Sequence, residues 1–421
     1  MKKTIALLSS LFIFLGSHAQ INQIFADEFP DSSKTRFGIT GGYSLGSNSI
    51  TNEFISKFYK GGYIDNNLKN NVWNRTRNRN RIGADLDYGI YGAFKLDSLC
   101  HKKNLSIFFC IRDREHFDMG FSRDLYKVGF YGNAPFAGKT ADFNGFNMML
   151  LRYQQLQIGL FSSKLDSAGR WGVGVSFLKG EQLASIYAKK AELFTSDDGQ
   201  YIDFNTSMAV AKSDTAKKGY GAFNGYGASV DIYFEAPFKT KFGDSKMRVS
   251  VSDIGLIKYN DRTLYLNQDS LFHYTGYSIN NLSDLQDSTI AGSTSQDSII
   301  AGIAPFKKQK VTITLPAVLN FSYETRFGKS FELSEGIHYI FNANYKLLFY
   351  VKGDFRLSPK VSVSATLSYG GYSTFNYGIG VFAKLGKGFM LYAGSNNIEG
   401  YIVPKKTTAQ GAYISLVKNF K

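Results

Sequence analysis

Ionisable side chains gather on one face of the β-strands that this sequence predicts, and they are its clearest candidates for chemistry. These candidates are Asp85, Asp87, Asp231, Glu235, Glu324, Arg326, Lys346, Lys352, Asp354 and Arg356. In each predicted strand they alternate with apolar residues, which places charges on one face and apolar side chains on the other. Such charges either pair with one another or line a polar pathway or binding site. Because both signs occur, no simple anion or cation filter is predicted.

Motifs for catalysis or metal binding are not found in the sequence. After the first nineteen residues the histidines are His101, His116, His273 and His338, which are too widely spaced for a metal-ligand motif. The sequence contains no Gly-x-Ser-x-Gly elbow, no Cys-x-x-Cys pair and no phosphate-binding glycine loop. It therefore predicts a protein that is not an enzyme and has no cofactor. The remaining alternative is a Ser, His and Asp site assembled from separate strands.

The strands that position the charges are clearest in the C-terminal stretch from Pro359 to Lys421. Apolar or aromatic residues alternate with small hydroxyl residues from Val361 to Tyr369, and a period of two returns from Phe375 to Leu385. A soluble β-sandwich alternates in the same way. Strands of about ten residues, aromatic residues near strand ends and Phe420 near the terminus are instead typical of an outer-membrane β-barrel. Closure of the barrel leaves no free strand edge in lipid.

The two faces of these strands have different predicted surroundings. The apolar face, with Val361, Val363 and Leu367, is expected to turn towards lipid. The charged face is expected to line the lumen, because a lysine or arginine facing lipid at mid-depth costs roughly 2–4 kcal/mol.

The N-terminus indicates export. Lys2 and Lys3 precede an apolar run from Ile5 to Leu15, and Ser17-His18-Ala19 fits a small-x-small cleavage site. The run is far shorter than the ~20 residues of a spanning helix, so a membrane anchor is the weaker interpretation. We therefore predict a cleavable signal peptide over residues 1–19 and one outer-membrane barrel domain over residues 20–421.

Composition and charge agree with an exported barrel. Gly (42), Phe (36) and Tyr (27) are abundant and Pro (7) is scarce, as expected for many turning strands with aromatic ends. The net charge of +15 is scattered through strands and turns, so nucleic acid is not predicted as a partner. Outer-membrane lipids and lipopolysaccharide are the expected anionic partners. Solvated loops are the alternative reason for the basic charge.

The predicted strands, from Arg36–Leu45 to Ala412–Phe420, number about 14, with 12 to 16 acceptable, and the expected fold is an all-β, transmembrane antiparallel barrel. The first, third, fifth and seventh connections are long and those between them are short. This asymmetry predicts long extracellular loops and short periplasmic turns. Short links near Ala343 and at Gly371–Ser373 interrupt the pattern.

Local signals add detail to the long connections. Short helices are predicted at Asn52–Tyr59 and Asp65–Trp73, and residues 116–146 and 259–308 are predicted as long loops. A hairpin is predicted from Ala184–Phe194 and Tyr201–Val210. A phase slip between Tyr153 and Leu156 suggests a β-bulge.

Short glycine-led stretches resemble an uncharacterised family of Bacteroidota outer-membrane barrels, catalogued as a domain of unknown function. They are Gly61-Gly62-Tyr63-Ile64-Asp65 with Leu68-Lys69, Asn80-Arg81-Ile82-Gly83, Gly132-Asn133-Ala134-Pro135-Phe136-Ala137-Gly138, Val251-Ser252-Asp253-Ile254-Gly255, Tyr369-Gly370-Gly371-Tyr372 and Gly394-Ser395-Asn396-Asn397-Ile398. That family is broadly similar to 14-stranded barrels of the fatty-acid-transporter type, including the shuttle barrel of type IX secretion. The resemblance implies an outer-membrane barrel and transfers no functional residues, because none of those relatives' functional residues match here.

Three functions are consistent with the sequence. The first is an integral outer-membrane barrel that passes or binds a small amphipathic solute through its polar lumen. The second is a non-transporting membrane scaffold, or an accessory of secretion or gliding machinery, that binds partner proteins through its long loops 47–80 and 259–308. The third is a soluble, exported, β-rich binding protein, which membrane fractionation with a heat-shifted gel band would separate from the other two.

Overall fold

The structure is a computed structural model, and it describes residues 33–96, 98, 104–162, 164–165, 169–214, 216–217, 219–241, 243–275 and 306–421. The predicted signal peptide, residues 1–19, lies outside the described residues, as does part of the predicted loop 259–308.

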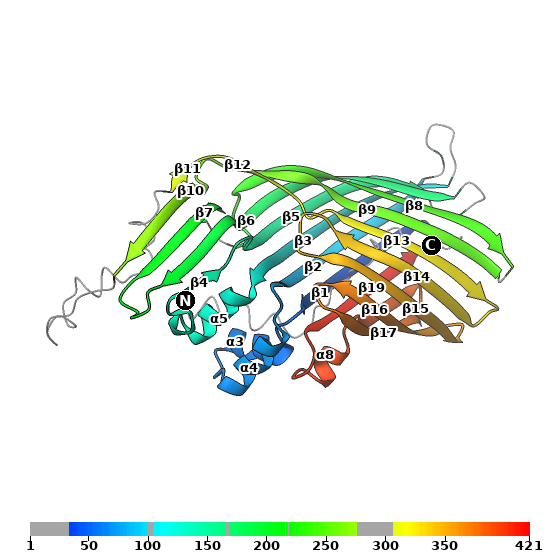
Figure 1. The fold of residues 1–421 in the computed structure, drawn as a ribbon. Coiled ribbons are helices and arrows are strands. Elements are labelled where there is room, and N and C mark those ends of the chain that lie inside the picture. The colour runs from blue at the N-terminus through cyan, green and yellow to red at the C-terminus, as the bar shows by residue number, and fades with distance from the viewer. Residues whose placement is uncertain are drawn as a thin grey trace.

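Fourteen antiparallel strands close into a barrel, which confirms the predicted fold class and strand number (Figure 1). The strands are β1 (Thr35–Ser47), β2 (Arg79–Leu96), β3 (Leu105–Ser122), β5 (Asn147–Ser162), β6 (Arg170–Thr195), β8 (Gly225–Thr240), β9 (Gly243–Tyr259), β13 (Val318–Phe327), β14 (Phe331–Ile340), β15 (Lys346–Ser358), β16 (Val361–Gly371), β17 (Phe375–Gly386), β18 (Phe389–Ser395) and β19 (Ala409–Phe420). Pairing of β1 with β19, from Thr35↔Phe420 to Gly46↔Ala409, closes the cylinder. No free edge remains in the barrel wall, as a spanning sheet requires.

The two ends of the barrel differ, as the connection lengths predict. At the short-turn end, where Thr35 and Phe420 meet, tight links such as residues 359–360 and 387–388 join neighbouring strands. At the loop end, residues 48–78 connect β1 to β2 and residues 260–317 connect β9 to β13. From β1 to β14 the connections between barrel strands are alternately long and short, which confirms the predicted asymmetry.

An apolar band surrounds the outside of the barrel. Its exposed side chains include Ile39, Ile90, Ile111, Leu156, Ile158, Val175, Ile232, Ile254, Phe349, Leu367, Ile379 and Ile414. Near the short-turn end the ring of Phe37 contacts those of Phe94, Phe109 and Phe420. An exposed apolar band with aromatic residues at its border is the surface that a transmembrane barrel presents to lipid.

One carboxylate interrupts the apolar band. Glu335 lies in the middle of β14, opposite Tyr323 of β13 and Val351 of β15, and its side chain is exposed on the outer face. It lines a shallow groove on that face with apolar and aromatic neighbours such as Ile337 and Leu367. A charge in this position is unfavourable in lipid.

Replacing this carboxylate with leucine is expected to stabilise the barrel. Glu335→Leu should raise the free energy of unfolding in phospholipid vesicles by about 1–2 kcal/mol, since it removes a charge from the lipid-facing side. Urea unfolding of the reconstituted protein measures the change. The control is Glu332→Leu, which removes the partner of Arg326 and should not stabilise. An unchanged or lowered stability of Glu335→Leu would show that the carboxylate is compensated in the membrane.

At the loop end the sheet continues beyond the barrel. The second half of β6 leaves β8 and pairs with β7 (Ile202–Lys212), which in turn pairs with β10 (Leu264–Tyr274). The second half of β6, β7 and β10 form what we call the extension sheet. Smaller strands lie in or next to it, namely β4 (Lys139–Asp142), β11 (Lys307–Lys308) and β12 (Val311–Thr314). The predicted hairpin of residues 184–194 and 201–210 is present. However, its first strand is the continuation of β6, and part of the predicted loop 259–308 is strand β10.

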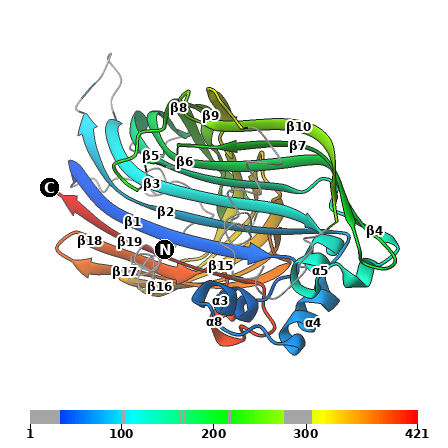
Figure 2. The same ribbon diagram turned by 90° about the vertical axis from the view of Figure 1, so that its left-hand side faces the viewer.

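Helices cover the outside of the wall at the loop end (Figures 1 and 2). They are α3 (Asn52–Lys60), α4 (Asn66–Arg75), α5 (Arg123–Tyr131), the short 3₁₀ turn η1 (Ala134–Phe136) and α8 (Glu399–Ile402). Side-chain caps begin the first two, because Thr51 accepts from the Phe54 amide and Asp65 accepts from the Leu68 amide. Phe54 packs in one core with Ile82, which lies on the outward face of β2. Among the described residues, no helix is long and apolar enough to cross a membrane.

Two local predictions need correction. Residues 116–146 are not one loop, because β3 continues to Ser122 and α5 follows at once. The phase of β5 does not slip either: Leu151, Tyr153, Gln155 and Gln157 are all buried on its inner face. The bulge lies in β6, where Glu181 is the extra residue between the partners of Arg152 and Tyr153. Inner residues of β5 are apolar near the loop end and polar further along the strand. In the sequence, this change resembles a slip in the alternation of the two faces.

Candidate functional site

The structure distributes the ten predicted site residues over three places. Asp85, Asp87 and Asp231 lie in or beside an internal cavity, whereas Glu235, Glu324, Lys352 and Asp354 take part in ion pairs nearer the short-turn end. Arg326 pairs with Glu332, and Lys346 and Arg356 are exposed towards the ends of β15. The last three are therefore not brought together with the cavity.

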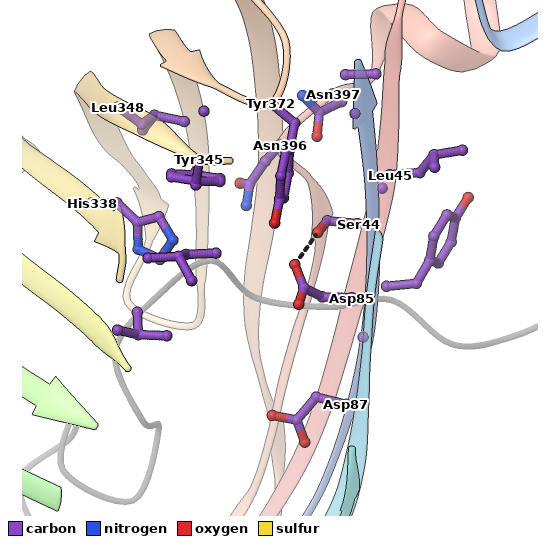
Figure 3. A pocket seen from close by; sticks show the side chains of 18 of the residues that line it. Ser44, Leu45, Asp85, Asp87, His338, Tyr345, Leu348, Tyr372, Asn396 and Asn397 are labelled. Carbon is purple, nitrogen blue, oxygen red and sulfur yellow. Dashed lines mark hydrogen bonds between the residues drawn. The ribbon is translucent and has the colours of Figure 1, made fainter. Parts of the chain in front are cut away.

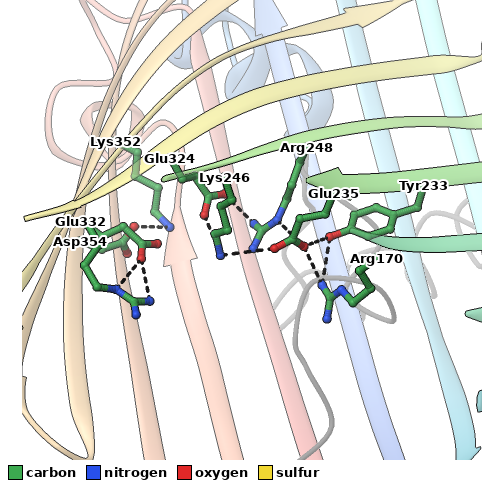
Figure 4. Close-up of polar contacts among 10 residues, drawn as sticks. Arg170, Tyr233, Glu235, Lys246, Arg248, Glu324, Glu332, Lys352 and Asp354 are labelled. Atoms are coloured by element: carbon green, nitrogen blue, oxygen red, sulfur yellow. Dashed lines mark hydrogen bonds and ion pairs between the residues drawn. The ribbon is translucent and has the colours of Figure 1, made fainter. Parts of the chain in front are cut away.

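A chain of paired charges follows the inner wall across four neighbouring strands, β6, β8, β9 and β13. This charge belt consists of Arg170, Tyr233, Glu235, Lys246, Arg248 and Glu324 (Figure 4). Arg248 is its centre, with Nε 3.1 Å from Glu235 and Nη1 2.6 Å from Glu324. Arg170 approaches Glu235 at 2.9 Å from the other side. Both carboxylates are buried, and each has more than one cation within reach.

The charge belt has the features of a structural element. A buried charge is tolerated when it is paired and hydrogen-bonded, and Glu235 and Glu324 meet both conditions. Lys352 and Asp354 on β15 form a further pair at 3.0 Å. The carboxylates of these groups are engaged by the neighbouring cations, so they offer little free binding capacity to a solute.

The internal cavity lies on the loop-end side of this region and holds about 170 Å³ (Figure 3). One wall carries Asp85 and Asp87 of β2 with Arg114 of β3, and the facing wall carries His338 of β14. Tyr345 and Tyr372 form an edge-to-face pair, with ring centroids 5.0 Å apart, beside Leu348. The cavity is thus lined by a charged side, a histidine and an aromatic side.

Polar atoms of this cavity are only partly satisfied. Asp85 Oδ1 lies 2.7 Å from His116 Nδ1, and the Ser44 hydroxyl is 3.5 Å from Asp85 Oδ2. His338 Nδ1 lies 2.7 Å from Asn320 Oδ1 and must be the donor there, which leaves Nε2 as an acceptor. Within the described residues, His338 Nε2 and Asp87 Oδ1 are buried with no hydrogen-bond partner. Two cavity-lining residues therefore have acceptor capacity left for a donor group.

A strained bulge holds the charged side of the cavity in place. Asp253 of β9 has φ +60° and lies in a bulge between the pairs Val230↔Ile254 and Ile232↔Val251. Its amide donates to Asp231 Oδ1 at 2.8 Å, and its carboxylate pairs with Arg114. Non-glycine residues in this conformation are uncommon, and aspartate tolerates it better than most. The bulge lies in the glycine-led stretch from Val251 to Gly255.

Two further glycine-led stretches meet at the cavity rim. Arg81 donates from Nε to the carbonyl of Gly371 at 2.7 Å and from Nη2 to that of Ser373 at 2.8 Å. Gly83 lies against the ring of Tyr372, where an added Cβ would be 2.1 Å from Cζ. Only glycine leaves room for the ring here, and Gly371 has φ +69°. The stretches around Gly83 and Gly371 therefore form one unit that positions Tyr372.

Sequence reasoning missed several residues in and around this cavity. Arg112 and Arg114 alternate with outward-facing residues on β3 and therefore point inwards, as Cys110 does. The period of two in the sequence could have identified them. Asp253 and Tyr372 lie in stretches that were recognised only as resemblances. His338 was treated as one of several isolated histidines, and nothing in its neighbourhood along the chain indicates the contact with Asn320.

Polar side chains also gather on the outer face, at the loop-end border of the apolar band. This outer polar cluster consists of Tyr88, Asp113, Arg152, Lys179 and Glu181, and Tyr220 covers it. Arg152 lies 3.4 Å from Asp113 and 3.2 Å from Glu181, and the ring of Tyr220 stacks on its guanidinium at 4.5 Å. The cluster marks where the apolar band ends on this side.

Within the described residues, no group of three His, Cys, Asp or Glu side chains is arranged to hold a metal ion.

Several solved structures resemble this chain over most of its length, at low sequence identity. The toluene transporter TodX of P. putida is 9% identical, with 93% of this chain and 91% of that chain covered and a TM-score of 0.39. A Pseudomonas aeruginosa FadL homologue is 10% identical, with 92% and 91% covered and a TM-score of 0.41. The translocator domain of the autotransporter NalP from Neisseria meningitidis is 8% identical, with 100% and 94% covered and a TM-score of 0.37.

No curated protein matches the sequence. A family model described as a family of unknown function (DUF5723) matches residues 29–396, which is most of the chain and includes all but the last two residues of the glycine-led stretches. The bulge at Asp253, the rim formed by Arg81 and Tyr372 and most of the cavity lining lie within the matched residues, whereas Asn397, Ala409 and Gly411 of the lining lie beyond them. The predicted membership of an uncharacterised family is therefore confirmed, and the chain belongs to the DUF5723 family of unknown function.

Proposed function

We propose that this protein is an outer-membrane β-barrel that binds a small amphipathic solute in its internal cavity and passes it through the lumen. The observation that carries the proposal is the cavity itself, which combines unpartnered acceptors on His338 and Asp87 with an aromatic side formed by Tyr345 and Tyr372. Its volume of about 170 Å³ is close to that of a cavity that holds benzene, roughly 150 Å³.

The chemistry of the lining favours a particular kind of solute. A hydroxyl or amine donor on the solute would satisfy His338 Nε2 or Asp87 Oδ1, which are otherwise buried without partners. An apolar body would pack on Tyr345, Tyr372 and Leu348. In this proposal the chain is exported by its signal peptide, the loop end faces outwards, and the surrounding partners are outer-membrane lipids and lipopolysaccharide. It contains no catalytic step and no cofactor.

Solute binding to the reconstituted barrel tests this proposal. Phenol and benzylamine are suitable donor-bearing probes, and benzene is the matched probe without a donor. His338→Leu and Asp87→Leu should each lower the affinity for the donor-bearing probes about ten-fold, as expected when a hydrogen bond with a buried or charged partner is lost. Isothermal titration and liposome uptake measure the effect.

The control variant is Asp269→Asn, an exposed residue of the extension sheet that does not line the cavity. Its affinities should equal those of the unchanged protein. Equal binding of all three probes, or no effect of either cavity variant, would contradict solute binding in this cavity.

A second function is favoured by the extension sheet. β6, β7 and β10 project beyond the barrel and expose Tyr187, Leu271 and Tyr274, which is suited to contact with another protein. A membrane scaffold or an accessory of secretion or gliding machinery would use this surface. Affinity purification from membranes compares the unchanged protein with the variant Tyr187→Ser/Leu271→Ser. If the variant retains every partner that the unchanged protein binds, this alternative is wrong.

A further inference from the structure

Apolar side chains are exposed on the helices that lie outside the barrel wall. The exposed fractions are 65% for Phe58 of α3, 71% for Ile402 of α8 and 84% for Tyr63, which follows α3. Tyr59, Tyr401 and Val403 are also exposed. Isolated exposed apolar residues are ordinary, but an apolar group gathered on neighbouring elements indicates a contact surface.

Hydrogen bonds join these helices into one unit. The amide of Asn52, at the start of α3, donates to the carbonyl of Thr407 at 2.9 Å, and the amide of Glu53 donates to that of Pro404 at 3.1 Å. Arg75 of α4 donates to the carbonyl of Lys406 at 3.1 Å. Figures 1 and 2 both show α3, α4 and α8 side by side next to the wall.

This unit lies at the border of the apolar band. The hydroxyls of Tyr43 and Tyr401 are hydrogen-bonded, which fixes α8 on the outer face of β1. On β1, Tyr43 is two outward positions from Ile39, which is 62% exposed in the apolar band. On the neighbouring strand β2, Tyr88 of the outer polar cluster pairs with Gly41 at the same level. The exposed residues of α3 and α8 therefore continue the lipid-facing surface at the loop end.

Lysines surround the apolar residues. Lys60, Lys405 and Lys406 are exposed and Lys57 is half-buried, and of these four only Lys57 has an ion pair with a carboxylate in the described part of the chain, at 3.4 Å from Glu53. The carboxylate of Glu399 accepts from the amide of Tyr377, and that of Asp65 accepts from the amide of Leu68 at the start of α4. An apolar tip with lysines around it is typical of segments that lie in the headgroup region and bind anionic lipids.

We infer that α3, α8 and residues 403–406 form a docking patch for phosphate-bearing lipids of the leaflet at the loop end. Phe58, Ile402 and Val403 enter the acyl-chain region, while Lys60, Lys405 and Lys406 bind the lipid phosphates. The inference depends on the proposed membrane location of the barrel and is independent of the proposed solute. Continuity with the apolar band and the excess of lysines favour lipid over a protein partner.

Spin-label accessibility tests the location of the patch. Labels at Ile402→Cys, Ile158→Cys and Tyr187→Cys are compared in the Cys100→Ser background, reconstituted in phosphatidylcholine vesicles. Residue 158 lies in the apolar band and residue 187 on the extension sheet. The label at 402 should be accessible to oxygen in the bilayer, at a shallower depth than the label at 158, whereas the label at 187 should be in water.

A water-exposed label at 402 with a lipid-exposed label at 158 would overturn the docking patch and leave the membrane barrel intact. Water exposure at both positions would instead overturn the membrane location on which the proposed function depends. The two failures are thus distinguishable.

Lipid selectivity tests the role of the lysines. The protein is reconstituted in phosphatidylcholine vesicles that contain a minor fraction of spin-labelled phosphatidic acid, and the relative association of the two lipids is measured. Lys60→Gln/Lys405→Gln/Lys406→Gln should lower the preference for phosphatidic acid about a hundred-fold, since each lysine is expected to contribute about five-fold. The matched control is Lys189→Gln/Lys190→Gln/Lys212→Gln on the extension sheet, which should retain the preference.

Unchanged selectivity in the first triple variant would overturn the assignment of the lysines. The assignment would also be wrong if inorganic phosphate displaced the labelled lipid while the type of lipid made no difference to its association. The docking patch requires the bound phosphate to belong to a membrane lipid.

Discussion

Arg248→Met is expected to destabilise the barrel by about 3–5 kcal/mol, the cost of removing one partner from a buried ion pair. Arg248 lies between Glu235 and Glu324, and its loss would leave two buried carboxylates facing each other across the gap. Arg170 remains with Glu235, and Lys246 remains 3.7 Å from Glu235 and 3.0 Å from Glu324, but the hydrogen bonds of the Arg248 guanidinium to both buried carboxylates are lost. The loss is measured from urea unfolding of the protein reconstituted in vesicles.

The control for this prediction is Arg326→Met, near the short-turn end of the same strand as Glu324. Arg326 and Glu332 form an exposed pair, so its loss should cost less than about 1 kcal/mol. Similar effects of the two variants would mean that the charge belt is hydrated and screened, which would contradict its role as a structural element.

Asp253→Val is the second large expected change, with a loss of stability of about 3–5 kcal/mol. Valine would be forced into the conformation with φ +60°, which β-branched residues avoid, and Arg114 would lose its closest carboxylate. The amide that donates to Asp231 would be displaced if the bulge relaxed. Cavity affinity for phenol should fall with stability, because Asp87 shares Arg114 with Asp253.

Asp253→Asn separates the two causes of this effect. Asparagine tolerates the positive φ and retains a hydrogen-bonding side chain, so only the charge of the pair is lost. It should be intermediate in stability, and Asp253→Gly should relieve the backbone while leaving Arg114 without this partner. If valine, asparagine and glycine were equally destabilising, backbone conformation would not contribute.

The barrel itself could be predicted because the sequence pattern that specifies it lies within each strand. A period of two, conspicuous from Val361 to Tyr369, identifies strands and separates their faces, and the spacing of the links gives the strand number. Leu367, which the alternation turns towards lipid, is 58% exposed on the outside. The predicted helices Asn52–Tyr59 and Asp65–Trp73 correspond to α3 and α4, which Thr51 and Asp65 cap in the structure.

The site could be predicted only in part, because its contacts join strands that are distant along the chain. Asp85 and Asp87 follow from parity, but the pairing of Arg114 with Asp253 depends on how β3 and β9 face each other across the barrel. The alternation of faces does not indicate the position along the barrel axis. Arg326, Lys346 and Arg356 were therefore grouped with the other lumen-facing charges, although they lie towards strand ends. Glu335 shows the reverse case, a charge on the apolar side.

The seam between β1 and β19 also governs how the cylinder must assemble. These two strands pair from end to end, yet all the other strands of the wall separate them along the chain. Until they meet, each presents an unsatisfied backbone edge to any other strand nearby. Pairing over so long a sequence separation is slow, because the entropy of closing the intervening loop opposes it. The nascent wall therefore has to be kept from aggregating until its first and last strands find each other.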